Sequence, residues 1–372
     1  MMSLILQTSV AAVAPLGFAL LITPIMLKLA HRYKWYDAVD ARKIHTKDTP
    51  HVGGVGIFAS MILGIATFYV LNRIVFNLEL VAFGKVALLL VALLAIHVTG
   101  VVDDFKNIRA RYKFLAQLIL ATVLVAAGFV VKGITLPWSG TVLHLGPAAY
   151  LLSAFWIISM SNAVNFVDGM DGLSGGAVAI AALTYGIVFA LLGAYTSALI
   201  AFTIFGAVVG FLFFNWPPAK IFMGDSGAIF LGFALGALPF LEHSGNPTLL
   251  VFSLVLSVSI FPILDTLMAI IRRLRRRIAI NVADKEHTHH KLLDFGIGER
   301  GILLMVYSLM VLPNAATILW AATKNDRYFW LVGTTWILVI LFFAILDVWY
   351  HKVELAARRS SPTQPKPADA GK

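Results

Sequence analysis

Cysteine is absent from this 372-residue sequence, and charged residues are scarce. Without cysteine the chain can form no disulfide bond and offers no thiolate as nucleophile or metal ligand. Asp, Glu, Lys and Arg together make up 13% of the chain, whereas hydrophobic residues make up 59%. Soluble globular domains carry about 25% charged and about 45–50% apolar residues. The composition therefore excludes an ordinary soluble domain and indicates a protein that crosses a membrane several times.

Long hydrophobic runs are the main feature of the chain. A helix needs about 20 predominantly apolar residues to cross the hydrocarbon core of a bilayer. Residues 1–27 contain no Lys or Arg, so the first run is expected to remain as a membrane helix and not to be a cleaved signal. The sequence predicts one all-α, polytopic membrane domain over residues 1–350, followed by a disordered tail over 351–372 that is rich in Pro, Ala and Lys. About eleven transmembrane helices are expected, at approximately 4–29, 52–71, 85–102, 113–132, 149–167, 173–193, 197–215, 228–242, 247–271, 301–323 and 329–350.

Lysine and arginine are distributed unevenly between the two sets of connecting segments. With the N-terminus outside, the inside loops and the tail hold 23 of the 29 Lys and Arg residues, and the outside segments hold five. Positively charged loops remain on the cytoplasmic side of a membrane, so the N-terminus is predicted outside and the C-terminus in the cytoplasm. The net charge of +10 then belongs to the cytoplasmic face, where it also attracts anionic lipid. No soluble basic domain is present to bind nucleic acid.

Acidic side chains gather on the same predicted face. Asp103 and Asp104 lie at the end of the third segment, Asp168 and Asp171 follow the fifth, and Asp225 follows the seventh. Carboxylates at the ends of membrane helices are costly unless something binds them. A hard cation carrying a phosphate would do so, because such cations take oxygen ligands. The sequence therefore predicts a cation and phosphate site built from the cytoplasmic loops.

The densest polar string lies at residues 159–176. Asn162, Asn165 and Asp168 recur in it at three-residue steps, which places them roughly along one helical face. Gly169 weakens the helix beside Asp168, as expected where a helix ends at a site.

Each acidic cluster also has a purely structural alternative. Asp103 and Asp104 could lie in a solvated loop with weak surface ion pairs. Asp225 could cap the eighth helix by accepting N–H bonds. Asn162 and Asn165 could bond neighbouring helices.

The loop after the ninth segment contains histidines and arginines with several interpretations. The string His287-Thr-His289-His290 could form a zinc site, a solvated loop or a contact with phosphate. The run 272–277 suits an anchor to lipid headgroups. Asp265 lies within the ninth segment, so it is expected to face the protein interior with Arg272 or Arg273 as its partner.

Four of these strings resemble, in order, the signatures of the polyprenyl-phosphate N-acetylhexosamine-1-phosphate transferases. The last string is similar to the branch that uses UDP-GlcNAc, because the phospho-MurNAc-pentapeptide translocase branch usually carries three adjacent histidines. In that translocase branch a Lys often stands at the third position after the Asp-Asp pair, where this chain has Asn107, so Lys106 receives no role. The strings are Asp103-Asp104, the Asn162-to-Leu173 string, Phe222-Met-Gly-Asp225-Ser-Gly and His287-Thr-His289-His290.

The resemblance implies a reaction in the bacterial plasma (inner) membrane. GlcNAc 1-phosphate would pass from UDP-GlcNAc to undecaprenyl phosphate, with release of UMP, at a cytoplasmic site that requires Mg²⁺ or accepts Mn²⁺. The product would start a cell-envelope polysaccharide such as O-antigen or the teichoic acid linkage unit. Another UDP-N-acetylhexosamine or phospho-MurNAc-pentapeptide remains the alternative donor, and the resemblance allows a homodimer.

The resemblance also assigns residues to roles. Asp225 is the expected direct Mg²⁺ ligand, with Asp168 or Asp104 close by. Asp103 is a candidate base or nucleophile, but a phosphate monoester has a second pKa near 6, so direct in-line attack with Asp103 as a positioning group is favoured. The catalytic set is Asp103, Asp104, Asp168, His289 and His290. The substrate-binding set is Asn162, Asn165, Asp171, Asn215, Phe222, His287, Lys113, Arg42 and Lys43, in which the uridine ring would stack on Phe222.

Two other classes of protein fit the sequence less well. An ion-coupled transporter places its acids near the middle of the bilayer between repeats, whereas here most acids lie at helix ends and no repeat is visible. A membrane scaffold would explain the basic face but not four Asp and His clusters on it.

Overall fold

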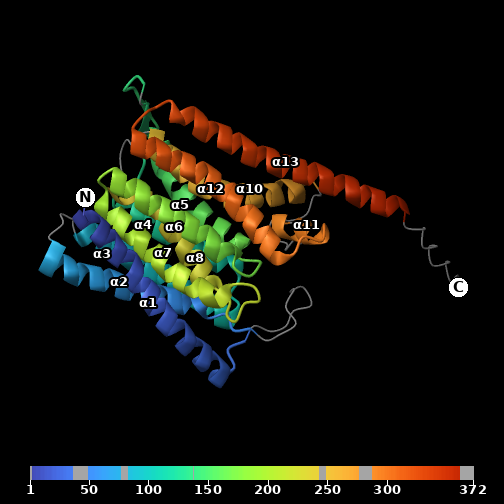
Figure 1. The fold of residues 1–372 in the computed structure, drawn as a ribbon, viewed down its shortest axis with the longest axis horizontal. Helices are drawn as coiled ribbons and strands as arrows, with labels where there is room; N and C mark the ends of the chain where they lie inside the picture. The colour runs from blue at the N-terminus through green and yellow to red at the C-terminus, as the bar shows by residue number, and fades with distance from the viewer. Residues whose placement is uncertain are drawn as a thin grey trace.

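Helices that run between the two ends of an elongated bundle make up almost all of the described chain (Figure 1). The computed structural model describes residues 2–36, 49–76, 83–136, 138–242, 249–275 and 287–360. The elements are α1 (Met2–Tyr33), α2 (Gly53–Leu71), the π-helix η1 (Asn72–Phe76), α3 (Phe83–Lys106), α4 (Ala110–Ala126), β1 (Gly133–Thr135), β2 (Val142–His144), α5 (Ala148–Val167), α6 (Leu173–Leu191), α7 (Tyr195–Asn215), α8 (Asp225–Ala237), α9 (Pro239–Glu242), α10 (Leu249–Arg275), α11 (Thr288–Asp294), α12 (Glu299–Thr323) and α13 (Tyr328–Ser360).

Ten helices in the described ranges are long and apolar enough to cross a membrane. They match ten of the eleven predicted segments, and the fold is that of a multi-pass, helical membrane protein. The remaining segment, 113–132, forms α4, whose 17 residues extend only about 25 Å at about 1.5 Å per residue. Gly128 takes a φ of +96° just beyond its end, and the short antiparallel hairpin β1–β2 follows. An eleventh span therefore stays a prediction, as does the orientation of the termini.

The last helix is longer than the sequence indicated. The final span was expected to end at residue 350, but α13 continues to Ser360. Residues 351–360 are therefore helical and not part of a disordered tail, and residues 361–372 lie outside the described chain. Figure 1 shows α13 running along one side of the bundle toward the end at which α11 lies.

The helix α8 forms the centre of the bundle. Every residue from Ser226 to Ala237 is buried, and α8 packs against α2, α3 and α5. A helix that is apolar on all sides belongs in the interior of a large assembly of helices. Asp225 is the first residue of this central helix, so the position of the aspartate depends on how α8 is held.

Two glycines allow neighbouring helices to approach the first turn of α8. A Cβ atom on Gly100 of α3 would lie 2.6 Å from the carbonyl oxygen of Asp225, and one on Gly54 of α2 would lie 2.1 Å from the Gly227 nitrogen. Such close backbone approach is available only to glycine. The imidazole of His97 adds a hydrogen bond from Nδ1 to the Ser226 carbonyl oxygen at 2.8 Å. The turn that carries Asp225 is therefore held from two sides.

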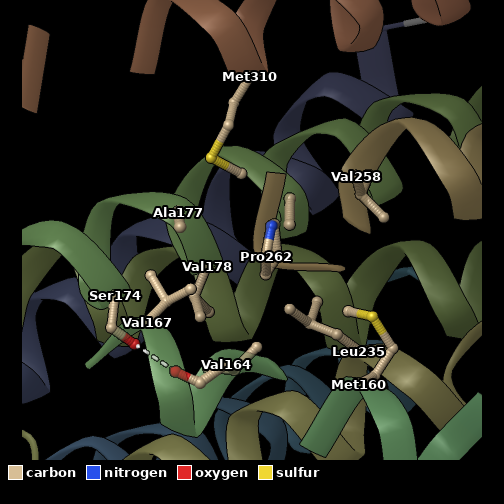
Figure 2. A pocket seen from close by; sticks show the side chains of 11 residues that line it. Met160, Val164, Val167, Ser174, Ala177, Val178, Leu235, Val258, Pro262 and Met310 are labelled. Carbon is tan, nitrogen blue, oxygen red and sulfur yellow. Dashed lines mark hydrogen bonds between the residues drawn. The ribbon is translucent and has the colours of Figure 1, made fainter. Parts of the chain in front are cut away.

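The interior beside the polar end is apolar and closely packed. A cavity of about 10 Å³ lies among α5, α6, α8, α10 and α12, and the side chains that line it are apolar except for Ser174 (Figure 2). Its hydroxyl, Ser174 Oγ, is already directed to the carbonyl oxygen of Val164 at 3.5 Å. A void of this size and polarity is not expected to hold water. The polar residues at the end of α5 thus lie beside an apolar interior.

Substitution of Gly100 by Ala is expected to destabilise the protein, because the added methyl group meets backbone atoms of Asp225 and Ser226 that cannot move aside. Overpacking of this kind costs about 1–3 kcal/mol. Thermal unfolding in detergent would measure the effect as a lower Tm.

The matched control is Gly84→Ala in the same helix, where a new Cβ meets no atom within 4 Å and helix propensity favours Ala. An equal Tm for the two variants would contradict the proposed close approach.

Candidate functional site

The ammonium group of Lys113 joins two of the predicted acidic clusters. Its Nζ donates to Asp103 Oδ2 and to Asp225 Oδ2, both at 2.7 Å. Asp103 is buried near the end of α3 and also accepts the backbone N–H of Ile108 at 2.8 Å. Two carboxylates placed this close repel each other unless a positive charge lies between them. Lys113 supplies that charge and fixes α3, α4 and α8 relative to one another.

The Asp104 carboxylate accepts hydrogen bonds from the backbone of α8. Its two oxygens accept the N–H groups of Asp225 at 2.7 Å and Ser226 at 3.1 Å. Asp104 therefore caps α8 from another helix, and the idea that Asp225 caps its own helix is wrong. The alternative that Asp103 and Asp104 belong to a solvated loop is also wrong, since both lie within α3.

The two asparagines of the polar string have different partners. Asn165 Nδ2 donates to Asp225 Oδ1 at 2.9 Å, so this amide belongs to the acidic cluster. Asn162 Nδ2 donates to Gln117 Oε1 at 2.8 Å and to the carbonyl oxygen of Ile158 at 2.8 Å. Asn162 thus links α5 to α4, as its structural alternative proposed, and its role in substrate binding stays a prediction.

Asp168 lies where α5 ends, and the negative charges of several neighbouring acids repel its carboxylate. Burial, followed by the charges of Asp225, Asp104 and Asp171, raises the pKa of Asp168 to about 8. Five carboxylates thus lie close together, and the ammonium group of Lys113 contacts two of them. They belong to Asp103, Asp104, Asp168, Asp171 and Asp225. Such an excess of negative charge marks a place that favours a cation.

His289 is directed toward the Asp168 loop. A Cβ atom on Gly169 would lie 2.9 Å from both Cε1 and Nε2 of His289, so the ring touches that loop. The ring is 3% exposed, and within the described ranges its Nε2 atom has no hydrogen-bond partner. Burial, aided by the charge of His290, lowers the pKa of His289 to about 3, although Asp265 acts in the opposite sense. A neutral imidazole with a buried, unpartnered nitrogen is therefore aimed at the acidic loop.

Asp265 has a different partner from the one predicted. Its carboxylate accepts hydrogen bonds from His287 Nδ1 at 2.7 Å, from Thr288 N at 2.8 Å and from Thr288 Oγ1 at 2.6 Å. The expectation of Arg272 or Arg273 as partner was wrong, because the histidine string folds back against α10. Arg272 lies 4.0 Å from Asp347 of α13 instead.

The expected uridine-binding residues lie together around the start of α6. Asn215 Oδ1 accepts the N–H of Gly172 at 3.0 Å, and its Nδ2 donates to the Ile221 carbonyl oxygen at 2.8 Å. Asp171 Oδ2 accepts the N–H of Ala219 at 2.7 Å. Phe222 is half-buried beside them. These bonds shape the loop after α7, while contact with a nucleotide stays a prediction.

Several residues of the site gave no signal of their role in the sequence. Gln117 and Tyr307, whose hydroxyl donates to the Gly172 carbonyl oxygen at 2.7 Å, were not singled out. Lys113 was expected to bind substrate and not to bridge two aspartates. The expected contacts of Arg42 and Lys43, and of arginines 276 and 277, fall outside the described residues.

The acidic cluster suits Mg²⁺ better than zinc. No three His or acidic side chains in the ranges that the structure describes are disposed to hold a metal ion by themselves. Zinc needs such a set, whereas Mg²⁺ uses one or two carboxylates together with waters and substrate phosphates. Asp225 and Asp168 could supply the two carboxylates of that smaller requirement, because a bound cation would relieve the repulsion that raises the pKa of Asp168. Asp104 is committed to the backbone of α8.

Comparison with known proteins shows which families the chain is similar to. Residues 86–241 match the family described as glycosyl transferase family 4. The chain is 32% identical over 340 residues to a probable undecaprenyl-phosphate N-acetylglucosaminyl 1-phosphate transferase of Bacillus subtilis, covering 91% of this chain and 90% of the relative. A decaprenyl-phosphate N-acetylglucosaminephosphotransferase of Mycolicibacterium smegmatis is 34% identical over 291 residues, or 72% and 70% of the two chains. A phospho-N-acetylmuramoyl-pentapeptide-transferase of Symbiobacterium thermophilum is 32% identical over 334 residues, or 83% and 97%.

The first of these relatives aligns with nearly the whole chain, including all four polar strings. The resemblance noted in the sequence is thereby confirmed, and a phospho-sugar transferase is the indicated class of enzyme. The chain belongs to the polyprenyl-phosphate N-acetylhexosamine-1-phosphate transferases of glycosyl transferase family 4, on the side of the N-acetylglucosamine-1-phosphate branch.

Proposed function

We propose that this protein transfers GlcNAc 1-phosphate from UDP-GlcNAc to undecaprenyl phosphate and releases UMP. The observation that carries the proposal is the meeting of Asp103, Lys113, Asp225 and Asn165 in one hydrogen-bonded cluster beside Asp168. We place this site at the cytoplasmic face of the bacterial plasma membrane. The product would start a cell-envelope polysaccharide.

The reaction exchanges one phosphoanhydride bond for another. An oxygen of undecaprenyl phosphate forms a bond to the phosphorus that carries the sugar, and the bond from that phosphorus to the bridging oxygen breaks. The electron pair leaves with UMP, so no net proton transfer is required. Because a phosphate monoester has a second pKa near 6, the lipid phosphate is already nucleophilic at neutral pH.

The side chains of the cluster then act mainly by orientation and charge. In-line phosphoryl transfer depends on positioning and on neutralising the equatorial oxygens. Asp225 and Asp168 would hold Mg²⁺, which when bound polarises the phosphoryl oxygens and offsets their charge. Lys113 holds Asp103 and Asp225 at a fixed separation. We assign Asp103 the positioning of the acceptor.

The histidine string can add hydrogen bonds to the diphosphate of the nucleotide sugar. His289 Nε2 has no partner in the described chain and is aimed at the Asp168 loop. A neutral imidazole can donate one hydrogen bond to a diphosphate oxygen without adding a full charge. His290 follows it in the same helix and is the second candidate donor.

The nucleotide that is released tests the proposal directly. Purified protein in detergent, supplied with undecaprenyl phosphate, UDP-GlcNAc and Mg²⁺, is expected to release UMP and to stop on addition of EDTA. Release of UDP would mean transfer of the sugar alone and would contradict the mechanism. UMP only from another UDP-N-acetylhexosamine, or only from UDP-MurNAc-pentapeptide, would keep the chemistry and replace the donor.

Substitution Asp225→Asn is expected to lower kcat by about 10²–10³-fold, because the variant removes the charge at the centre of the cluster. The protein should still insert and elute as the wild type does in size-exclusion chromatography. The control is Asp326→Asn, an exposed acid in the connection between α12 and α13, which should keep wild-type activity. A fully active Asp225→Asn variant would refute the assignment.

Substitution Lys113→Gln leaves Asp103 and Asp225 facing each other without a cation between them. The two carboxylates are then expected to separate or to take up a proton, and kcat should fall by about 10²-fold. Lys106→Gln, an exposed lysine at the end of α3, is the matched control. Equal activity of the two variants would show that the bridge has no role in turnover.

A further inference from the structure

The short helix α11 carries His289 and His290 and is attached to the membrane bundle at both of its ends. It has seven residues and precedes α12, so the histidines do not lie on one of the membrane-spanning helices. Their direction is therefore set by side-chain contacts made to α10 and α13. The proposed reaction assigns no role to these contacts.

The end farther from the histidines is held by α13. Lys291 Nζ donates to Asp347 Oδ1 at 2.5 Å, and the Tyr350 hydroxyl donates to Asp294 Oδ2 at 2.8 Å. The ring of Phe295 stacks on Trp349 with centroids 4.5 Å apart. Three side chains of one helix thus fix the position of α11 without touching His289.

The first turn of α11 is held by α10 through a single carboxylate. Asp265, which is 3% exposed, accepts three hydrogen bonds from the two residues His287 and Thr288. His287 is the residue just before the helix. A buried carboxylate that receives three donors fixes both the position and the rotation of the segment that supplies them.

The direction of His289 follows from that of His287. The two rings are nearly parallel, with an interplanar angle of 11° and centroids 6.1 Å apart. The edge of His289 that carries Nε2 meets Gly169, the neighbour of Asp168. A rotation of the first turn of α11 would therefore carry this nitrogen away from the acidic loop.

We propose that Asp265 is a positioning residue, which holds His287 in one tautomer and orientation so that His289 Nε2 faces the Asp168 loop. The expected effect on kcat rests on the proposed function, whereas the contacts of Asp265 with His287 and Thr288 do not depend on it. Asp265 touches neither the acidic cluster nor, by this assignment, the substrates. It acts through His287 and Thr288.

The substitution Asp265→Asn separates this role from simple burial. A carboxylate only accepts hydrogen bonds, so His287 must present a protonated Nδ1 to it. Asn has nearly the same shape, and its oxygen can still accept from Thr288, but its amide group donates toward His287. The ring must then carry its proton on Nε2 or turn away, while the contacts with α13 keep the helix in place.

Kinetics and amide hydrogen exchange of the full-length protein test the proposal together. Asp265→Asn is expected to lower kcat by about 10–100-fold, the usual effect of losing an orienting partner, with both KM values within about threefold. Amide exchange over residues 288–294 should become faster. The matched control is Thr266→Val, whose hydroxyl has no partner in the described chain, and it should change neither quantity.

A double-mutant cycle then shows whether the effect passes through His287. In a His287→Ala background, Asp265→Asn should reduce kcat by no more than about threefold, because the partner has already been lost. The same large loss in both backgrounds would overturn the proposal, as would unchanged kcat and exchange in the single variant. An equal fall of Tm and kcat in Asp265→Asn and Thr266→Val would also overturn it.

The outcome for Asp265 is distinguishable from the outcome for the proposed reaction. If the wild-type protein releases no UMP from any UDP-sugar, the proposed function fails, while faster exchange in Asp265→Asn but not in Thr266→Val still supports the positioning role. If the wild type is active and Asp265→Asn matches it in rate and exchange, only the positioning role fails.

Discussion

Carboxylates of neighbouring helices repel one another at close range unless a cation lies between them, and Lys113 is the cation that lies between Asp103 and Asp225. This one ammonium group connects the end of α3, the beginning of α4 and the first turn of α8. The central helix is fixed at its start for this reason, and its remaining residues can be apolar on every side. The arrangement of the polar end as a whole depends on that contact.

The acids of the cluster are alike in chemistry but are used for different purposes. Asp104 gives both oxygens to the backbone of α8, and Asp171 gives one to the loop after α7. Asp103 and Asp225 share a lysine, and Asp168 keeps the repulsion of its neighbours. Asp104 and Asp171 thus accept backbone hydrogen bonds, and Asp103 and Asp225 form ion pairs with Lys113. Asp168 is left with the repulsion of the neighbouring acids, which a bound cation would relieve.

Hydrophobic run length and polar grouping were enough to predict most of the fold and the location of the site. Ten spans and the meeting of the Asp and His strings follow from those two features. The pairing of individual side chains could not be predicted, because helical periodicity gives the face of a residue but not the helix opposite. Asn162 and Asn165 lie on one face, yet the first meets Gln117 and the second meets Asp225. Asp265 likewise bonds a histidine 22 residues away, where charge alone suggested a nearby arginine.

The attachment of α11 to α13 has a consequence for biosynthesis. The aspartates and Lys113 lie within the first 225 residues, but the helix with the histidines is held by Asp347, Trp349 and Tyr350 near the end of the chain. Membrane helices enter the bilayer in the order in which the ribosome makes them. The acidic cluster can therefore assemble while the chain is still being synthesised, and Asp265 of α10 can hold the first turn of α11 soon afterwards, whereas the other end of α11 gains its contacts only after α13 has been inserted. A nascent chain would hold its negative charges together before α11 is attached at both ends.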